Sequence, residues 1–385
     1  MFGLTALALV AQSAAALASL QIPPKPYGFF VNSTIYQPVG NESITYPRFT
    51  ELQDGTIIAT ASYRGPEPAY FPVFESDDGG ASWRWISDIK DQVNGWGFPA
   101  QPALMELTEP LAGFQPGTIF ASGNSWSNST TDNGTRIDLY ASTDRARSWD
   151  FVSHIAEGAP PNTTNGHHPI WEPYLLTYDN SLVCFYSDQR DSGTPSNPKG
   201  HGQKLVHQVS KDLIHWDDPV EDVAYDQYIA RPGMTVVEYI PPLEKWILVH
   251  ELPVGNSSSH GANYPVYYVL ADSPLEFRHS EGIPIVINNQ TAPNASPYVT
   301  WTPIGGLNGT IIVSDADNPQ VYTNSFGGDP DKWEELWTPA GATYSRAIHV
   351  LNKHPDHLLI FGGETYDGMD LGLLTPFAAT VVKLG

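Results

Sequence analysis

The sequence contains a single cysteine, Cys184, in 385 residues, so no disulfide can form within the chain. Basic residues are also few: 19 Lys and Arg stand against 42 Asp and Glu, which gives a formal net charge of −23. Nucleic-acid binders need a positive surface to displace counterions from phosphate, and anionic lipid attracts basic segments. We therefore expect neither nucleic acid nor membrane as a partner, whereas a neutral polysaccharide remains possible.

Long uninterrupted helical segments are missing as well. With 33 glycines and 34 prolines, the sequence is broken at short intervals, and no amphipathic helix of normal length fits between the breaks. Hydrophobic residues nevertheless make up 41% and aromatic residues 12% of the chain, which is enough for a large core. The composition therefore argues against a mostly helical fold.

The N-terminus resembles a secretory signal. Residues 1–11 are almost entirely apolar, and Ala16-Leu17-Ala18 provides a small-x-small cleavage site before Ser19. We predict a signal peptide over 1–18 and a secreted, extracellular protein, with a buried N-terminal helix as the alternative. Asn-x-Ser/Thr sequons fit a secreted glycoprotein; they lie at Asn32, Asn41, Asn128, Asn133, Asn162, Asn256, Asn289, Asn294 and Asn308.

An internal repeat gives the first indication of architecture. The segment 76–83 reads Ser-Asp-Asp-Gly-Gly-Ala-Ser-Trp and matches the Asp-box, Ser-x-Asp-x-Gly-x-x-Trp; 142–149 and 210–216 are weaker copies. In such a hairpin turn, the Asp carboxylate accepts local backbone N–H bonds and Trp packs across the strands. The copies are spaced by 66 and 68 residues, the length of one four-stranded propeller blade. Degenerate copies follow near 272–275 and 323–326.

A second repeat, upstream of each turn, gives the number of blades. Strand-like runs begin near 46–48, 99–101, 170–172, 230–232, 296–298 and 344–346, and a turn and second strand follow. Six starts over 19–385 give about 61 residues per blade, which suits four strands and their connections. The last blade lacks a fourth strand, which we expect Tyr27–Val31 to supply. The prediction is one domain over 19–385, a six-bladed, all-β propeller of four-stranded antiparallel blades.

This topology places one set of residues on one rim of the central channel. The starts of the first strands and the ends of the second strands share that rim, because the two strands are antiparallel. The rim is rich in ionisable and aromatic groups, although basic residues are scarce elsewhere. We therefore identify it as the substrate-binding face; its candidate binding residues are Arg48, Arg64, Trp126, Trp171, Asp188, Arg231, Tyr344 and Arg346.

Two carboxylates on this rim are the catalytic candidates. Glu172 begins a first strand between Trp171 and Tyr174, aromatic residues that suit stacking on sugar rings. Glu251 ends the second strand of the following blade. A pair of carboxyl groups is what glycoside hydrolysis requires, and adjacent blades permit the spacing of either the retaining or the inverting mechanism. Glu172 could instead be an ion-pair partner of Arg231 that holds blades together.

No cofactor or metal is expected. The adjacent His167 and His168 on an extended segment would direct their rings to opposite sides, which is unsuited to a shared metal, and no phosphate-binding loop is present. The Asp-box carboxylates are assigned to turns, and Arg48 and Arg346 could also be ion-pair partners that fill the channel.

The Asp-boxes and the Tyr-Pro-Arg of 46–48 followed by Asp-Gly-Thr at 54–56 resemble the sialidase superfamily. Within it, the chain is similar to the fungal exo-α-1,5-L-arabinanases of glycoside hydrolase family 93. That resemblance implies a monomeric six-bladed propeller that hydrolyses linear plant cell-wall arabinan, releases arabinobiose from the non-reducing end with retention, and uses two glutamates. The motifs that carry it are Trp171-Glu172-Pro173, 186–190, 202–206, 231–234 and Glu251.

By local motif, the two catalytic glutamates of the family correspond to Glu172, cast as acid/base, and Glu251, cast as nucleophile, although the roles could be reversed. Two alternatives stay open. A sialidase would use Arg48, Arg231 and Arg346 to hold a carboxylate and Tyr344 as nucleophile. A sugar-binding propeller would keep the fold without catalysis.

Overall fold

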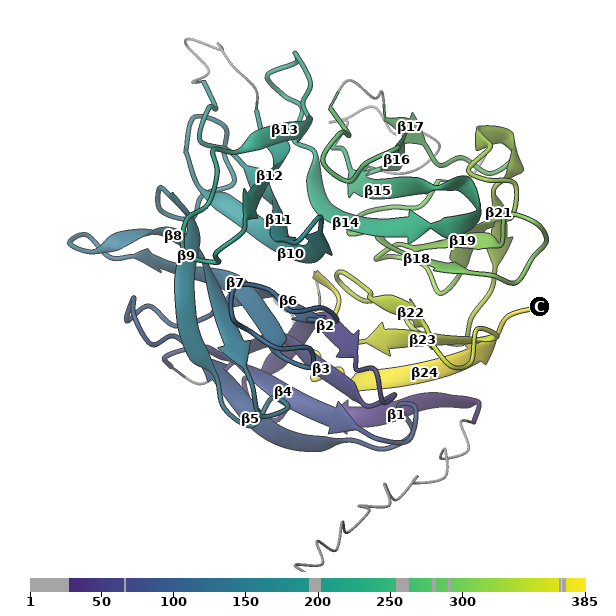
Figure 1. The fold of residues 1–385 in the computed structure, drawn as a ribbon, viewed down its shortest axis with the longest axis horizontal. Helices are drawn as coiled ribbons and strands as arrows, with labels where there is room; N and C mark the ends of the chain where they lie inside the picture. Colours follow the sequence, from purple (N-terminus) through teal and green to yellow (C-terminus); the bar gives the residue numbers. More distant parts are fainter. Residues whose placement is uncertain are drawn as a thin grey trace, which may run out of the picture.

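Six four-stranded antiparallel sheets surround a central axis in the computed structural model, so the predicted propeller is confirmed (Figure 1). The structure describes residues 28–65, 67–193, 202–253, 263–278, 282–289, 292–366, 368 and 372–385. The predicted signal peptide, 1–18, lies outside these ranges.

Each blade is built from consecutive strands, innermost first. Blade 1 holds β2 (Ser43–Glu51), β3 (Ile57–Arg64), β4 (Tyr70–Ser76) and β5 (Arg84–Lys90); blade 2 holds β6 (Ala100–Glu106), β7 (Ile119–Asn128), β8 (Asn133–Ser142) and β9 (Asp150–Gly158). Blade 3 holds β10 (Ile170–Tyr178), β11 (Ser181–Asp188), β12 (Lys204–Ser210) and β13 (Val220–Val223); blade 4 holds β14 (Gly233–Ile240), β15 (Lys245–Glu251), β16 (Val266–Ala271) and β17 (Ile283–Pro284). Blade 5 holds β18 (Tyr298–Thr302), β19 (Thr310–Ser314), β20 (Val321–Asn324) and β21 (Glu334–Leu336), and two short 3-10 helices span Pro241–Leu243 and Pro330–Lys332.

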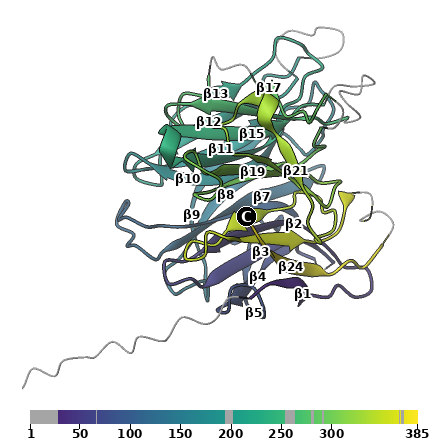
Figure 2. The ribbon, with the colours of Figure 1, turned by 90° about the vertical axis from the view of Figure 1, so that its right-hand side faces the viewer.

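The ring is closed by the N-terminal strand. Blade 6 contains β22 (Ile348–Val350), β23 (His357–Gly362) and β24 (Phe377–Lys383), and β1 (Phe30–Tyr36) is its outermost strand, side by side with β24 in Figures 1 and 2. The sequence therefore predicted the right source for this strand but set it about four residues too early. This strand pairing holds the N-terminal and C-terminal parts of the chain together in one sheet.

The predicted Asp-box turns join the third and fourth strands of their blades. In the first, Asp78 accepts hydrogen bonds from the backbone N–H and the hydroxyl of Ser82, at 2.9 and 2.5 Å, and the Trp83 indole donates to the Gly80 carbonyl at 2.8 Å. In the second copy, Ala146 takes the glycine position with φ 62°. These contacts confirm that the Asp-box carboxylates belong to turns.

A feature that the sequence did not reveal recurs at the rim end of the inner strands. One non-glycine residue of every blade there has a left-handed backbone, with φ between 47° and 64°. In blades 1 to 4, this residue coincides with an irregularity in the strand register, a β-bulge. The bulge re-aims the backbone N–H and side chain toward the rim. The left-handed residues of blades 1 to 6 are Tyr46, Gln101, Glu172, Met234, Ser296 and Ser345, of which the first four are bulge residues.

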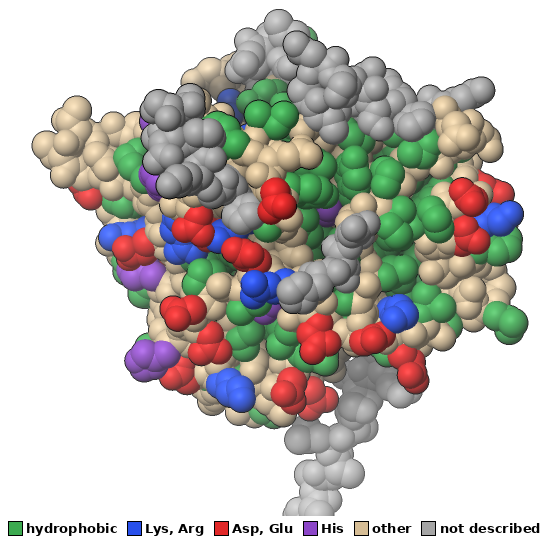
Figure 3. Space-filling model, turned by 90° about the horizontal axis from the view of Figure 1, so that it is seen from above, with side chains coloured by type: hydrophobic (Ala, Val, Ile, Leu, Met, Phe, Trp, Pro, Cys, Tyr) green, Lys and Arg blue, Asp and Glu red, His purple; other side chains and the backbone are tan. Residues whose placement is uncertain are grey.

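Apolar faces of neighbouring blades form the core. Between blades 3 and 4, for example, Phe185, Leu205 and Leu248 pack in one buried cluster. Each such side chain contributes about 1.5 to 3 kcal/mol relative to exposure. Acidic and basic side chains are scattered over the face shown in Figure 3, so the net negative charge is not gathered in one patch there. Among the described residues, no helix is long and apolar enough to cross a membrane.

Candidate active site

Glu172 is the bulge residue of blade 3. Its backbone N–H donates to the side-chain oxygens of Gln101 and Asn124 in blade 2, at 3.1 Å each. Its carboxylate oxygen Oε2 accepts hydrogen bonds from the Ser187 hydroxyl at 2.7 Å and from the Met234 backbone N–H at 2.8 Å. Both ends of the residue are therefore fixed, and its carboxyl group lies between blades 3 and 4.

Glu251 ends β15, opposite Gly233 of the inner strand. Its Oε2 accepts a 2.7 Å hydrogen bond from the backbone N–H of Ser296, the left-handed residue of blade 5. Ser62 and Asn124 do the same in blades 1 and 2, where each accepts the N–H of the next blade's bulge residue. In blade 4, Glu251 thus occupies the position at which Ser62 and Asn124 bind the backbone of the next blade, and it places a carboxyl group there.

The two carboxyl groups meet above Gly233. A methyl group at Gly233 would lie 3.4 Å from Oε2 of Glu172 and 3.6 Å from Oε1 of Glu251. These two oxygens are therefore at most about 7 Å apart, which admits the ~5 to 5.5 Å of retaining glycosidases and only the lower end of the ~6.5 to 9.5 Å of inverting ones. The absence of a side chain at Gly233 leaves this space open.

Burial and neighbouring charges affect the pKa values of the two carboxyl groups differently. Burial, and then the negative charge of Glu172, raise the pKa of Glu251 to about 8. Burial also raises the pKa of Glu172, but the hydrogen bonds from Ser187 and Met234 and the charges of Arg231 and Arg48 oppose the rise. Because two carboxylates this close disfavour ionising together, the pair holds a proton near neutral pH, and Glu251 is the better place for it.

Arg231 supplies a positive charge that acts on both glutamates. Its guanidinium donates to the side-chain oxygens of Asn165, at 2.7 Å, and Gln203, at 2.9 Å. Its charge acts on the pKa values of both Glu172 and Glu251. Arg231 therefore lies close enough for its charge to act on both glutamates and to stabilise an ionised carboxylate.

Aromatic side chains form the rest of the surroundings. The rings of Tyr46 and Tyr344 are 5.9 Å apart, edge to face. Burial is the main cause that raises the pKa of each phenol, and the negative charges of Glu172 and Glu251 raise it further. The Arg48 guanidinium lies 3.9 Å above the Tyr46 ring. Next to Glu172, the buried Trp171 contacts the half-buried Trp126 edge to face at 5.8 Å. The structure thus brings Arg48 and Tyr344 toward the glutamates, while Trp171 and Trp126 form a pair with each other beside Glu172 in the chain.

Three of the predicted binding residues are not brought to the pair. Arg346 is completely buried and pairs with Asp315, 3.8 Å away, so it has no surface to offer a sugar. Asp188 is buried and forms a 2.8 Å ion pair with Arg190 of its own blade. Arg64 is exposed at the outer end of β3, opposite Ser43, with no described contact to Glu172 or Glu251.

Sequence reasoning also missed members of the site. Tyr46 stands at a predicted strand start, but only the bulge shows that its ring faces the glutamates. Asp317 is exposed just beyond β19, accepts a hydrogen bond from Asn294, and its negative charge raises the pKa of Glu251. Its position just after β19, the second strand of blade 5, is the feature of the sequence that could have identified Asp317 as a rim residue.

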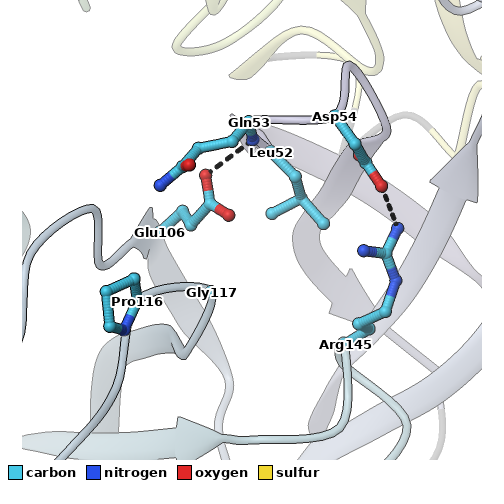
Figure 4. A pocket seen from close by; sticks show the side chains of 7 residues that line it. All are labelled: Leu52, Gln53, Asp54, Glu106, Pro116, Gly117 and Arg145. Carbon is cyan, nitrogen blue, oxygen red and sulfur yellow. Dashed lines mark hydrogen bonds and ion pairs between the residues drawn. The ribbon is translucent and has the colours of Figure 1, made fainter. Parts of the chain in front are cut away.

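A separate recess of about 180 Å³ lies between blades 1 and 2 on the opposite rim, at the β2–β3 and β6–β7 turns (Figure 4). Its ionisable groups are engaged: Arg145 pairs with Asp54 at 2.8 Å, and Glu106 accepts the Gln53 N–H at 2.9 Å. It lacks the facing carboxyl groups found above Gly233.

No protein-family model and no curated protein sequence matches the chain. Among solved structures, the chain is similar to the GH93 α-L-arabinofuranosidase of Fusarium graminearum with arabinobiose, at 39% identity over 92% of this chain and 98% of that one, with a TM-score of 0.85. An α-L-arabinanase of Penicillium chrysogenum complexed with arabinobiose matches at 36% identity, with the same coverage and a TM-score of 0.84. A sialidase of Streptococcus pneumoniae, at 9% identity and a TM-score of 0.55, covers 94% of this chain and 71% of its own and shares the fold alone.

Proposed function

The chain belongs to glycoside hydrolase family 93, and from this membership we propose that it is a retaining exo-arabinanase that releases arabinobiose from the non-reducing end of linear α-1,5-L-arabinan. The observation that carries the proposal is the pair Glu172 and Glu251, whose carboxyl oxygens face one point above Gly233. Arabinobiose is the sugar named in the similar structures.

The surroundings of the two glutamates support a division of roles. Glu172 receives two hydrogen bonds and the charges of two arginines, which favour its ionised form. Glu251 receives one hydrogen bond and has a pKa of about 8, so it holds a proton at neutral pH. We therefore assign Glu172 as nucleophile and Glu251 as acid/base, the reverse of the roles first suggested by the sequence.

In the first step, the Glu172 carboxylate attacks the anomeric carbon as Glu251 gives its proton to the leaving glycosidic oxygen, so the C–O bond breaks and a glycosyl ester forms on Glu172. In the second, Glu251 takes a proton from water, the water attacks the same carbon, and the ester bond breaks. The product is released with net retention, and both glutamates return to their starting protonation.

The sialidase alternative requires three arginines around one carboxylate. Arg346 is buried with Asp315, so it does not join Arg48 and Arg231 at the rim. No observation favours that chemistry over arabinan hydrolysis.

Incubation with linear α-1,5-arabinan, followed by chromatography, tests the proposal. We expect arabinobiose as the sole early product, no action on a fluorogenic sialoside, and loss of turnover in E172Q and E251Q with the fold intact. Binding of arabinan without any product would instead support a non-catalytic sugar-binding propeller. A mixture of oligosaccharides as the first products would contradict the exo mode.

The roles are separated by azide rescue of the alanine variants on an aryl arabinoside. E251A should be rescued with formation of the α-glycosyl azide, because the ester on Glu172 still forms and azide then replaces it. E172A should give the β-glycosyl azide by direct displacement. The opposite pattern would restore the roles suggested by the sequence.

A further inference from the structure

Arg346 and Asp315 form an ion pair in the interior between blades 5 and 6. Asp315 follows β19, Arg346 precedes β22, and both side chains have no exposed surface. A buried ion pair has a desolvation cost that its own attraction seldom exceeds, so its retention needs another reason. Neither residue can contact a substrate from this position.

Asp315 connects to the rim through a set of hydrogen bonds. Its Oδ1 accepts the Asn318 backbone N–H at 3.2 Å, and its Oδ2 accepts the Asn318 side-chain amide at 2.5 Å and the Tyr322 hydroxyl at 3.3 Å. Oδ2 also accepts the backbone N–H of Asn294 at 2.9 Å. Asn294 precedes β18 and begins the segment that leads to Ser296.

That segment has an unusual backbone. Ala295 and Ser296 both adopt left-handed conformations, with φ of 64° and 47°, which a non-glycine residue takes only when its surroundings hold it there. The Ala316 N–H donates to the carbonyls of both Asn294 and Ala295 at 3.1 Å, and the Ala295 N–H donates to Tyr264 at 2.9 Å. The result of this turn is that the Ser296 N–H points at Oε2 of Glu251, 2.7 Å away.

We propose that Arg346 and Asp315 are positioning residues for Glu251: their ion pair fixes Asn294, and through the left-handed turn at Ala295 and Ser296 it fixes the N–H that holds the Glu251 carboxyl group. The inference rests on the proposed function, because it gives Glu251 a role in the reaction.

Loss of the ion pair acts on the pKa of Glu251 in two ways. A hydrogen bond from Ser296 N–H favours the ionised carboxylate, so loosening the turn raises the pKa of Glu251. Removal of the negative charge of Asp315 would, by itself, lower that pKa. The two effects oppose each other in D315N, so an alkaline limb that moves to higher pH in that variant shows that the loosened turn dominates. The other charged or titratable groups that act on Glu251 are Glu172, Arg231, Asp317, Tyr46 and Tyr344.

The test compares pH profiles of arabinan hydrolysis. R346M and D315N are expected to lower kcat on the order of 10- to 100-fold with little change in KM, because the acid is misplaced while the binding surface is intact. The alkaline limb of kcat/KM should move to higher pH. R346K, which keeps the charge, should recover most of kcat and the limb. N318A, which removes one donor to Asp315 at a half-buried turn, should move the limb in the same direction by less.

D138N is the matched control. Asp138 is as buried as Asp315 and contacts His154 at 2.7 Å, but it lies in β8 on the outer side of blade 2. The D138N substitution should lower Tm without changing kcat or the alkaline limb of kcat/KM. If R346M, D315N and N318A lose Tm in the same way and keep the wild-type kcat and limb, the proposal is wrong. If R346M and D315N do not fold, N318A alone decides: an alkaline limb of kcat/KM at the wild-type pH in N318A would also overturn the proposal.

Wild-type activity on arabinan is measured alongside. An inactive wild type contradicts the proposed function and this inference together. An active wild type with unaffected variants contradicts this inference alone.

Discussion

The Ser187 hydroxyl donates a 2.7 Å hydrogen bond to Oε2 of Glu172, the same oxygen that accepts the Met234 N–H. Hydrogen bonds to a charged group contribute about 1.5 to 3 kcal/mol. S187A should therefore lower kcat/KM about tenfold or more. Loss of the donor raises the pKa of Glu172, so the acidic limb of the pH profile, which reports the ionised nucleophile, should move to higher pH.

S122A is the control for this variant. Ser122 lies on the second strand of blade 2, and its buried hydroxyl has no hydrogen-bond partner in the part of the chain that the structure describes. Its kcat/KM and the acidic and alkaline limbs of its pH profile should equal those of the wild type. An S187A enzyme that behaves like S122A would show that this hydroxyl does not stabilise the nucleophile.

Arg231 and Arg64 were both expected in the site, and the structure separates them. R231M removes the charge that favours the ionised form of both glutamates, so kcat/KM should fall on the order of 100-fold. R64A alters an exposed side chain away from the pair and should stay within about twofold of the wild type. Steady-state kinetics on arabinan measures both. Equal losses in the two variants would place the substrate elsewhere on the rim.

The raised pKa of Glu251 also affects stability. The folded pKa, about 8, lies above the unfolded value of 4.5, so the stability contributed by the protonated group is complete below pH 4.5 and is lost as the pH rises through 8. E251Q cannot ionise and should therefore raise Tm by a few degrees at pH 8. At pH 4.5, the difference from the wild type should nearly vanish. A calorimetric scan that shows the same difference at both pH values would exclude a raised pKa as its cause.

The blade count, the Asp-box turns, the closing strand and the pair Glu172 and Glu251 followed from the sequence, because the repeat sets the blade boundaries and thereby places equivalent positions of neighbouring blades on one rim. The bulges did not follow. They place non-glycine residues such as Tyr46 and Gln101 in left-handed conformations, which no local preference indicates.

The error on Arg346 has this physical origin. Arg48 and Arg346 both stand near strand starts and looked equivalent. Arg48 is two residues beyond its bulge residue, and Arg346 is one residue beyond Ser345. Arg346 lies before β22, and its guanidinium donates to the backbone carbonyls of Gln320 and Gly341 and faces Asp315. These partners come from distant segments, and the spacing of residues in the sequence does not reveal them.

Of the sequons found in the sequence, Asn294 should carry no glycan. Its side-chain amide donates to Asp317, and its side-chain oxygen accepts the Tyr264 N–H at 2.9 Å. A glycan there would break contacts that lead to Ser296 and Glu251. Asn41, by contrast, is exposed. Peptide mapping by mass spectrometry, after expression through a secretory host, should find Asn294 unmodified, and an active enzyme with Asn294 fully glycosylated would contradict the expectation.

The most direct measurement of the central claim is the anomeric form of the first product. Proton NMR during the first minutes of hydrolysis of α-1,5-arabinan reports it before the sugar mutarotates. A retaining pair made of Glu172 and Glu251 predicts that the α-anomer of arabinobiose is formed first and the β-anomer only later. Initial formation of the β-anomer, or no arabinobiose at all, would contradict the account.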